Sequence, residues 1–352
     1  MIAPDPVEEA LEALIAAQGP IPLARYMAMA NAAYYASHDP FGAKGDFITA
    51  PEVSQMFGEL VGLALADAWT HVGGVPHYVE LGPGRGTLAQ DALRAMASAG
   101  LRPPVHFVET SPLLRRAQAE RVPHAQWHAG IGSLPEDGPL MIVANEFFDA
   151  LPIEQYVKTA AGWREHMVDR IGSEFRIIAG ALPTPDLIPE TLRDAPPGSI
   201  CERASQGIAL VRDLALRVAR QGGLMIVIDY GYHGPHGGDT LQAVHAHGYV
   251  DPMVRPGTRD LTAHVDFGAL IAAAAVPGAR VCGPVEQGDW LVALGIDIRA
   301  DQLSRAHPGR AAELAAARMR LIHPEQMGSL FKVAGVSGGD WPLVPGLGGD
   351  AP

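Results

Sequence analysis

Four short apolar runs recur along the chain, and each ends beside polar or acidic residues. They begin at Tyr78, Val105, Leu140 and Leu224 and read YVEL, VHFVE, LMIVA and LMIVID. Near-continuous apolar runs of this length are typical of strands in a parallel sheet that is covered on both faces. Helical patterns separate most of these runs. The hydrophobic pattern therefore predicts an α/β fold with helices on both sides of a central sheet.

The segments outside this alternation predict three additions. The N-terminal section is helical and carries a glycine-rich stretch that we interpret as a lid. Between Gln155 and Ile200, shorter strand-like pieces and prolines predict an inserted antiparallel hairpin. Ser304–Ile322 is expected to be a helix, and the glycine- and proline-rich stretch 338–352 a poorly ordered tail. The predicted division is a helical lid region over 1–75, the core over 76–300 with its insertion at about 155–200, and a C-terminal region over 301–352.

The stretch YVELGPGRG has glycines at three alternate positions, Gly82, Gly84 and Gly86. Glycines this close let the backbone turn from a strand into a helix and approach a ligand without a Cβ in the way. Dinucleotide-binding loops have the spacing G-x-G-x-x-G, whereas this loop is G-x-G-x-G with an acid, Glu80, before its first glycine. The spacing favours S-adenosylmethionine over NAD.

Two carboxylates flank the glycine loop. Glu80, at the end of the first strand, is suited to the ammonium group of that cofactor. Glu109, at the end of the second strand, is positioned to accept hydrogen bonds from both ribose hydroxyls. The positive end of the helix after the loop favours the carboxylate of the cofactor. The alternative is a glycine-rich turn and a surface acid in an ordinary α/β domain.

The third strand runs into Asn145, Glu146 and Asp149. Because open α/β sheets bind ligands beyond the carboxyl ends of their strands, these three are candidate catalytic residues. Carboxylates hold a guanidinium group and ease its loss of a proton, so the segment is a plausible trap for a nitrogen-bearing acceptor. The alternative is a helix start, with Asn145 as the N-cap and both acids near the helix dipole.

Two other segments offer candidate site residues. GDFITAPEVS places Asp46, Thr49 and Glu52 in the predicted lid, which would exclude water from the crevice. Thr49 and Glu52 also have the spacing of a capping box for the next helix. TRDLTAHVDF has polar residues at every second position, and His264 within it is a candidate proton acceptor. A structural hydrogen-bonding histidine is the alternative there.

Composition narrows the function classes. The formal net charge of −13 and the sequence pI of about 5.5 argue against a nucleic-acid ligand and suit a basic protein segment. Cys201 and Cys282 are far apart and indicate neither a disulfide framework nor a thiolate metal site. The histidines between 233 and 247 match no zinc-binding spacing, so no metal is expected. No apolar run reaches membrane-spanning length. The acidic N-terminus lacks the basic start of a signal peptide and the arginines of a transit peptide, which predicts a cytoplasmic protein.

Several longer strings are distinctive. In chain order they are YYASHDPFGAKGDFITAPEVSQMFGE, VELGPGRGTL, NEFFDALP, IDYGY, RPGTRDLTAHVDF, EQGDWLVALGI and MGSLFKV. Together they resemble the MidA-like family of complex I assembly methyltransferases, which has bacterial and mitochondrial members. The resemblance extends over nearly the whole chain. One departure is the tryptophan of EQGDWLVALGI, where we would expect phenylalanine.

The resemblance implies a Rossmann-like sheet of S-adenosylmethionine-dependent methyltransferases. It also implies protein arginine methylation, since the mitochondrial members symmetrically dimethylate an arginine on a core subunit of respiratory complex I. The cofactor positions of the family fall on Glu80, Gly82, Gly84, Gly86 and Glu109. We therefore expect a protein arginine N-methyltransferase that acts on a complex I subunit or its bacterial homologue. A non-catalytic assembly chaperone that binds the cofactor and a small-molecule N- or O-methyltransferase remain open, as does a homodimer.

Overall fold

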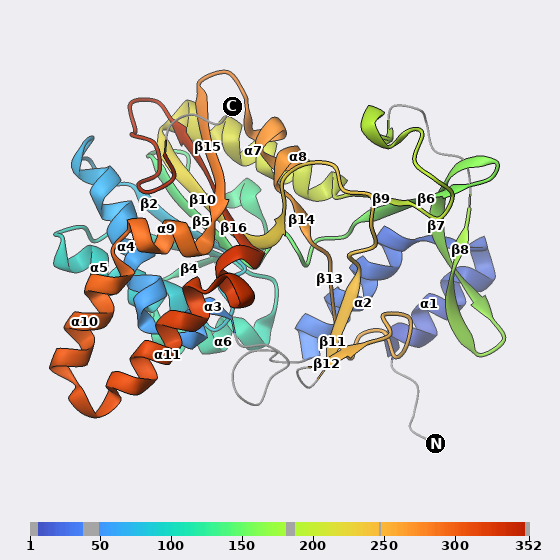
Figure 1. Ribbon diagram of the computed structural model, residues 1–352, viewed down its shortest axis with the longest axis horizontal. Helices are drawn as coiled ribbons and strands as arrows, with labels where there is room; N and C mark the ends of the chain where they lie inside the picture. The colour runs from blue at the N-terminus through green and yellow to red at the C-terminus, as the bar shows by residue number, and fades with distance from the viewer. Residues whose placement is uncertain (1–5, 38–48, 181–186, 246–247, 349–352) are drawn as a thin grey trace.

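A central sheet organises the larger part of the molecule (Figure 1). The computed structural model describes residues 6–37, 49–180, 187–245 and 248–348. Over these residues the sheet has the strand order β15-β16-β10-β5-β2-β3-β4, with β14 beside β10. β10, β5, β2, β3 and β4 are parallel, whereas β15 and β16 add an antiparallel edge. The strands are β2 (His77–Leu81), β3 (Val105–Val108), β4 (Gln126–His128), β5 (Leu140–Asn145), β10 (Gly223–Tyr232), β14 (Val265–Asp266), β15 (Ala279–Glu286) and β16 (Phe331–Gly338).

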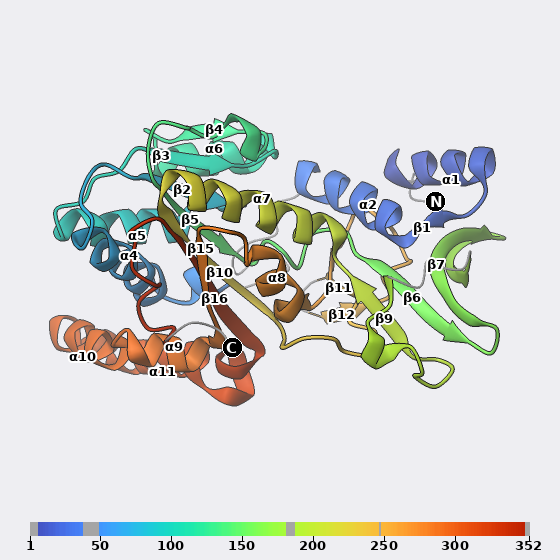
Figure 2. The same cartoon turned by 90° about the horizontal axis from the view of Figure 1, so that it is seen from above.

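The four apolar runs form β2, β3, β5 and β10, so the predicted α/β fold with a parallel centre is confirmed. Side chains that alternate along each strand enter two separate cores, because successive residues of a strand point to opposite faces. On β2, Tyr78 packs with α4 and α5, while Val79 and Leu81 pack with α7 and α8. Figure 2 shows α7 and α8 lying across one face of the sheet. The helices are α4 (Gln55–Thr70), α5 (Thr87–Ser98), α6 (Pro112–Arg121), α7 (Ser205–Gln221) and α8 (Phe267–Ala274).

The helices α4 and α5 pack unusually closely. A Cβ atom on Gly62 of α4 would lie 2.4 Å from the backbone oxygen and 2.7 Å from the Cα of Ala92 on α5. Real Cβ atoms do not approach backbone so closely, so this crossing requires a glycine. The contact fixes α5, which begins directly after the glycine loop.

The N-terminal helices and the inserted strands form a smaller part at the other end of the molecule, as both ribbon views show (Figures 1 and 2). The insertion is an antiparallel sheet, as predicted, and β1 from the N-terminal section adds a strand to it. Tyr26, Val168 and Leu261 share one hydrophobic core there, so three distant segments are held together. The elements are α1 (Pro6–Gln18), β1 (Ile21–Pro22), α2 (Leu23–Ser37), β6 (Glu154–Thr159), β7 (Gly162–Ile171), β8 (Glu174–Ala179), β9 (Ile200–Arg203), β11 (Gln242–His245), β12 (Gly248–Val250) and β13 (Asp260–Thr262).

The C-terminal region differs from the prediction in two respects. The expected helix over 304–322 is divided by a break at Pro308–Arg310 between α10 (Ile296–Ala306) and α11 (Ala311–Ile322). The prediction of a poorly ordered tail is wrong for residues 338–348, since Trp341, Val344 and Leu347 are buried in the main core. These three apolar side chains outweigh the glycines and prolines around them. α9 (Gln287–Ala293) precedes α10, and the predicted division into three regions stays a prediction.

Over the described ranges, none of the helices combines the length and the apolar character that a membrane span requires.

Candidate functional site

The glycine loop lies between the end of β2 and the start of α5, as its sequence predicts. Gly82, Gly84 and Gly86 all have positive φ, at 57°, 52° and 81°. Other residues rarely adopt this conformation. At Gly82 a Cβ would also lie 2.9 Å from the ring of Phe147. Each glycine is therefore required by the backbone, and the loop is shaped to hold a ligand close to the main chain.

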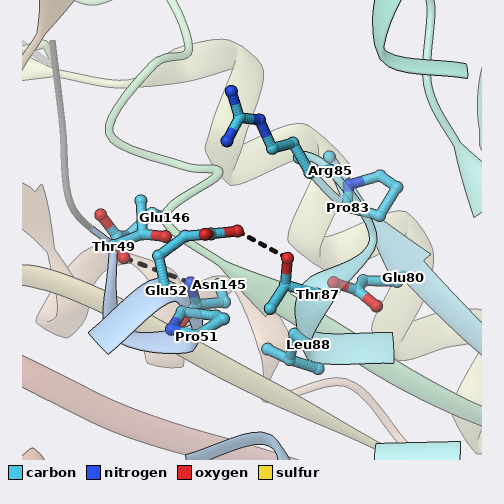
Figure 3. A pocket seen from close by; sticks show the side chains of 12 residues that line it. Thr49, Pro51, Glu52, Glu80, Pro83, Arg85, Thr87, Leu88, Asn145 and Glu146 are labelled. Atoms are coloured by element: carbon cyan, nitrogen blue, oxygen red, sulfur yellow. Dashed lines mark hydrogen bonds between the residues drawn. The ribbon is translucent and has the colours of Figure 1, made fainter. Parts of the chain in front are cut away.

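Two adjoining hollows meet at this loop. Gly82, Gly84 and Glu146 line both of them. The smaller hollow, shown in Figure 3, is otherwise lined by Thr49, Pro51, Glu52, Glu80, Pro83, Arg85, Thr87, Leu88 and Asn145. The larger is a cavity of about 670 Å³ that extends past Glu109 to α2 and Leu210. The carboxyl ends of β2, β3 and β5 thus open into one continuous crevice, as expected for an open α/β sheet.

Buried acids dominate the smaller hollow. Burial raises the pKa of Glu80 to about 8, although the Tyr78 hydroxyl donates a hydrogen bond of 2.7 Å to its carboxylate. Burial, and then the neighbouring charge of Asp149, raise the pKa of Glu146 to about 8 as well. Perturbed acids in a crevice are typical of sites that bind charged ligands or move protons. This arrangement suits positively charged ligands.

Glu146 is held in a strained turn. Its φ of 49° is uncommon for a residue with a side chain. Asp229 is fully buried on β10, directly after the stretch that pairs with β5. It accepts hydrogen bonds from the backbone N–H groups of Phe147, Phe148 and Asp149 at 3.0 to 3.3 Å. This carboxyl group therefore fixes the turn that directs Glu146 into the crevice.

The alternative of a helix start at Asn145 is wrong, because residues 146–153 form a turn and an extended connection instead. Asp149 lies behind Glu146, where Tyr230 donates a hydrogen bond of 2.5 Å to its Oδ2 atom. Burial raises the pKa of Asp149 to about 6. Asp149 lines neither hollow, so of the three catalytic candidates in this segment only Asn145 and Glu146 reach the crevice.

Two buried oxygens near this turn have no hydrogen-bond partner among the described residues, namely Asn145 Oδ1 and Asp149 Oδ1. Buried acceptors are nearly always paired in folded proteins. Asn145 lines the crevice, whereas Asp149 lies behind it. The donor to Asn145 Oδ1 is therefore expected to come from a bound molecule, and a donor group of S-adenosylmethionine or of a nitrogen-bearing acceptor would fit.

Glu109 follows β3 and lines the larger cavity. Burial raises its pKa, although the backbone N–H of Ser111 donates a hydrogen bond of 2.7 Å to its Oε1 atom. Arg115 Nε holds its backbone carbonyl at 2.8 Å. The carboxylate lies beside the glycine loop, in the position expected for a ribose-binding acid.

Thr49 and Glu52 also lie at the crevice, whereas Asp46 falls outside the described residues. The capping-box alternative is wrong, because Thr49 makes no side-chain cap bond and Ser54 caps α4 instead. Figure 3 shows the Glu52 carboxylate reaching Thr87, whose hydroxyl donates a hydrogen bond of 2.5 Å to it. The short helix α3 (Ala50–Val53) is thereby tied to the start of α5.

His264 is not brought to the crevice. It lines a separate cavity of about 190 Å³ and its ring packs against Tyr230, with centroids 5.3 Å apart. Burial lowers its pKa. The expected alternation around it is also wrong, since Asp260 and Thr262 are buried like their apolar neighbours Leu261 and Ala263. Tyr230 thus links His264 to Asp149.

Sequence reasoning missed the roles of Asp229, Tyr230 and Thr87. Asp229 was detectable as a further acid at a strand end, because β10 runs beside β5 and its carboxyl end reaches the same edge. Nothing in the sequence indicates that its carboxyl group accepts the N–H groups of a turn about 80 residues earlier. Tyr230 follows it directly and could not be paired with Asp149 without the fold.

A glycine loop after the first parallel strand, an acid after the second and buried acids after the third together define an α/β S-adenosylmethionine-dependent methyltransferase. A family model described as "Putative S-adenosyl-L-methionine-dependent methyltransferase" matches residues 60–285. The chain belongs to this family, and its resemblance to the MidA-like methyltransferases is confirmed.

Similar proteins extend over nearly the whole chain. The protein arginine methyltransferase NDUFAF7 homolog of Drosophila melanogaster is 37% identical over 92% of this chain and 82% of its own length. The human protein arginine methyltransferase NDUFAF7 is 34% identical over 90% of this chain and 80% of its own length. A crystal structure from Burkholderia thailandensis, bound to S-adenosyl-homocysteine, has a TM-score of 0.84 at 27% identity and covers 99% of this chain and 96% of that one. These findings confirm the fold and S-adenosylmethionine as the cofactor.

The prediction of a cytoplasmic protein is contradicted by these relatives, because the fly and human proteins are mitochondrial. The prediction rested on an acidic N-terminal segment and on two cysteines whose spacing suggests no disulfide framework. Cysteine spacing does not distinguish one reducing compartment from another.

Proposed function

We propose that this chain methylates an arginine side chain of a protein, and that the acceptor is a subunit of respiratory complex I or its bacterial homologue. The names of the relatives and the MidA-like sequence strings support this proposal. The observation that carries it is the set of buried carboxyl groups, Glu146 with Asp149 and Asp229 behind it, at the junction of the two hollows. A guanidinium is the side chain whose charge and paired donors match such a site.

The cofactor end of the crevice is formed by five residues. Gly82, Gly84 and Gly86 bring the backbone to the methionine part of the cofactor, Glu80 pairs with its ammonium group, and Glu109 accepts both ribose hydroxyls. When bound, the cofactor supplies a methyl group on a positively charged sulfur. Thr49 and Glu52 close the far side of this hollow and reduce its exposure to water.

At the acceptor end, Glu146 and Asn145 orient the guanidinium, and Asp149 adds negative charge behind them. In the ligand-free chain Glu146 is mostly protonated at neutral pH, since its pKa is about 8. The positive charges of the cofactor and the guanidinium lower this pKa, so Glu146 is ionised in the complete assembly. It then accepts the proton that the arginine nitrogen loses as its bond to the methyl group forms.

Replacing Glu146 with Gln tests this assignment. The variant is expected to bind S-adenosyl-homocysteine as the natural protein does, but to lose about 100-fold or more in turnover, the usual contribution of a proton acceptor. Glu286→Gln is a matched control, because Glu286 is a partly exposed acid on β15 outside both hollows. Equal turnover in the Glu146 variant and the control would remove Glu146 from the mechanism.

The acceptor class is tested with a radiolabelled methyl donor. Purified protein is added to an extract of cells that lack it, and labelled products are identified by mass spectrometry. We expect label on an arginine of one protein. Label confined to metabolites would indicate a small-molecule methyltransferase instead. Restored complex I assembly by a Gly84→Val protein that no longer binds the cofactor would indicate a chaperone.

A further inference from the structure

A fully buried glutamine connects the glycine loop to Glu109. Gln118 lies on α6, directly after the β3 strand, and has no exposed surface. Its Nε2 atom donates a hydrogen bond of 2.7 Å to the carbonyl oxygen of Gly84 and lies 3.3 Å from Glu109 Oε2. Its Oε1 atom accepts a hydrogen bond of 2.8 Å from the indole N–H of Trp127. All the polar atoms of this side chain are therefore engaged.

The orientation of this amide group is fixed by its partners. An indole N–H can only donate, whereas a backbone carbonyl and an ionised carboxylate can only accept. A flipped amide would oppose donor to donor at Trp127 and acceptor to acceptor at Gly84. The Gln118 NH₂ group must therefore face both the loop and Glu109.

The glycine loop also packs against Gln118. A Cβ on Gly86 would lie 3.5 Å from the Cα of Gln118, so the glycine loop packs directly against α6 at this point. Glu109 is held from two sides, with Oε1 bound by the backbone N–H of Ser111 and Oε2 facing Gln118. The backbone N–H of Thr110 also contributes a hydrogen bond to this carboxylate, and Glu109 lines the larger cavity.

We propose that Gln118 is a positioning residue that sets the Glu109 carboxylate for the two ribose hydroxyls of the cofactor and holds the glycine loop at the matching distance. This inference rests on the ribose-binding role proposed for Glu109. Without the amide donor, Glu109 Oε2 loses a partner that favours its ionised form, and the carboxylate is held only from the backbone side, by Ser111 and Thr110. The carbonyl of Gly84 loses its partner in the same step.

The decisive measurement compares two ligands by calorimetry. One is S-adenosyl-homocysteine, and the other is its analogue that lacks both ribose hydroxyls. The natural protein is expected to prefer the ligand with the hydroxyls. In Gln118→Met, affinity for S-adenosyl-homocysteine should fall about 5- to 20-fold, and the preference for the hydroxyls should shrink by a similar factor. A methionine keeps the length and volume of the side chain but cannot donate.

The two roles give different signatures. If Gln118 only supports the fold, both ligands weaken equally and the preference is unchanged, which would overturn the inference. If the natural protein itself shows no preference for the hydroxyls, the ribose role of Glu109 fails, and the inference fails with it for that separate reason. Glu109→Gln is the reference for complete loss of the preference.

Two further variants distinguish loss of the positioning contact from a general loss of stability. Gln287→Met removes another fully buried glutamine, one that donates to the carbonyl of Leu321 on α11, and it should leave the preference unchanged. Trp127→Phe removes only the indole donor that orients Gln118, and it should reduce the preference by a smaller factor in the same direction. A normal preference in Trp127→Phe together with failure of Gln118→Met to fold would assign Gln118 a purely structural role.

Discussion

Binding of the cofactor is expected to expel a proton from Glu80. This carboxyl group is buried in the smaller hollow, and burial raises its pKa to about 8. At pH 7 it is therefore about 90% protonated in the ligand-free protein. An ammonium group within about 4–6 Å lowers the pKa of a carboxyl by about 1 to 3 units, because it favours the charged form. Pairing with the cofactor should thus ionise Glu80.

The size of the effect follows from these two pKa values. If binding lowers the pKa from about 8 to about 6, the bound fraction of protons at pH 7 falls from about 0.9 to about 0.1, and about 0.8 proton is released. Because protons are released, affinity rises with pH. Between pH 6 and pH 7 the same values give an increase of about five-fold, over a range in which the ammonium group itself stays protonated.

S-adenosyl-homocysteine is the suitable ligand, since it has the ammonium group but an uncharged sulfur. Calorimetry at pH 7 in buffers of different ionisation enthalpy gives the number of protons released. Glu80→Gln should release close to none and should bind with an affinity that is nearly constant from pH 6 to pH 7. The reasoning is refuted if the natural protein releases no proton, or if the variant releases as many.

Two further predictions concern stability. Gly62→Ala places a Cβ against Ala92, so it should lower the free energy of unfolding by about 3 kcal/mol in chemical denaturation, while Gly309→Ala, which has open space, should change it by under about 0.5 kcal/mol. Burial lowers the pKa of His106 from 6.5 to about 4, so the unfolded chain binds the extra proton and stability should fall as the pH drops from 6.5 to 4. In His106→Phe this part of the denaturation profile should be flatter; an unchanged slope would contradict the assignment.

The central sheet and the cofactor loop follow from local sequence. β2, β3, β5 and β10 are short, apolar and mostly separated by helices, so their identity and parallel direction require little tertiary information, whereas their order in the sheet does. The three loop glycines have positive φ because the backbone turns there, which is a local requirement. The C-terminal tail shows the limit of such reasoning. Its composition predicts disorder, but three apolar side chains find a place in the core that only the fold provides.

The part of the site at the end of β5 was less predictable, because long-range contacts decide its geometry. Asn145, Glu146 and Asp149 were found from their place after β5, but their separation into two crevice residues and one residue behind them depends on the turn held by Asp229. Gln118 has no sequence signal, since a glutamine on a helix is ordinarily exposed. The alternation of polar and apolar residues around His264 predicts one exposed face, but every residue of β13 is buried.

The cost of the buried acids gives the site its selectivity for cations. An unfolded chain ionises Glu80 at about pH 4.5, whereas the folded chain keeps it protonated up to about pH 8, so at pH 7 its burial costs about 3 kcal/mol of stability. This cost increases as the pH rises from 4.5 to 8. A cationic ligand that pairs with the carboxylate recovers part of it, whereas a neutral or anionic ligand recovers none. The same reasoning applies to Glu146, whose pKa is also raised to about 8. The free energy of unfolding is therefore lower while no cation is bound in the crevice. Only a positively charged ligand recovers this energy when it binds.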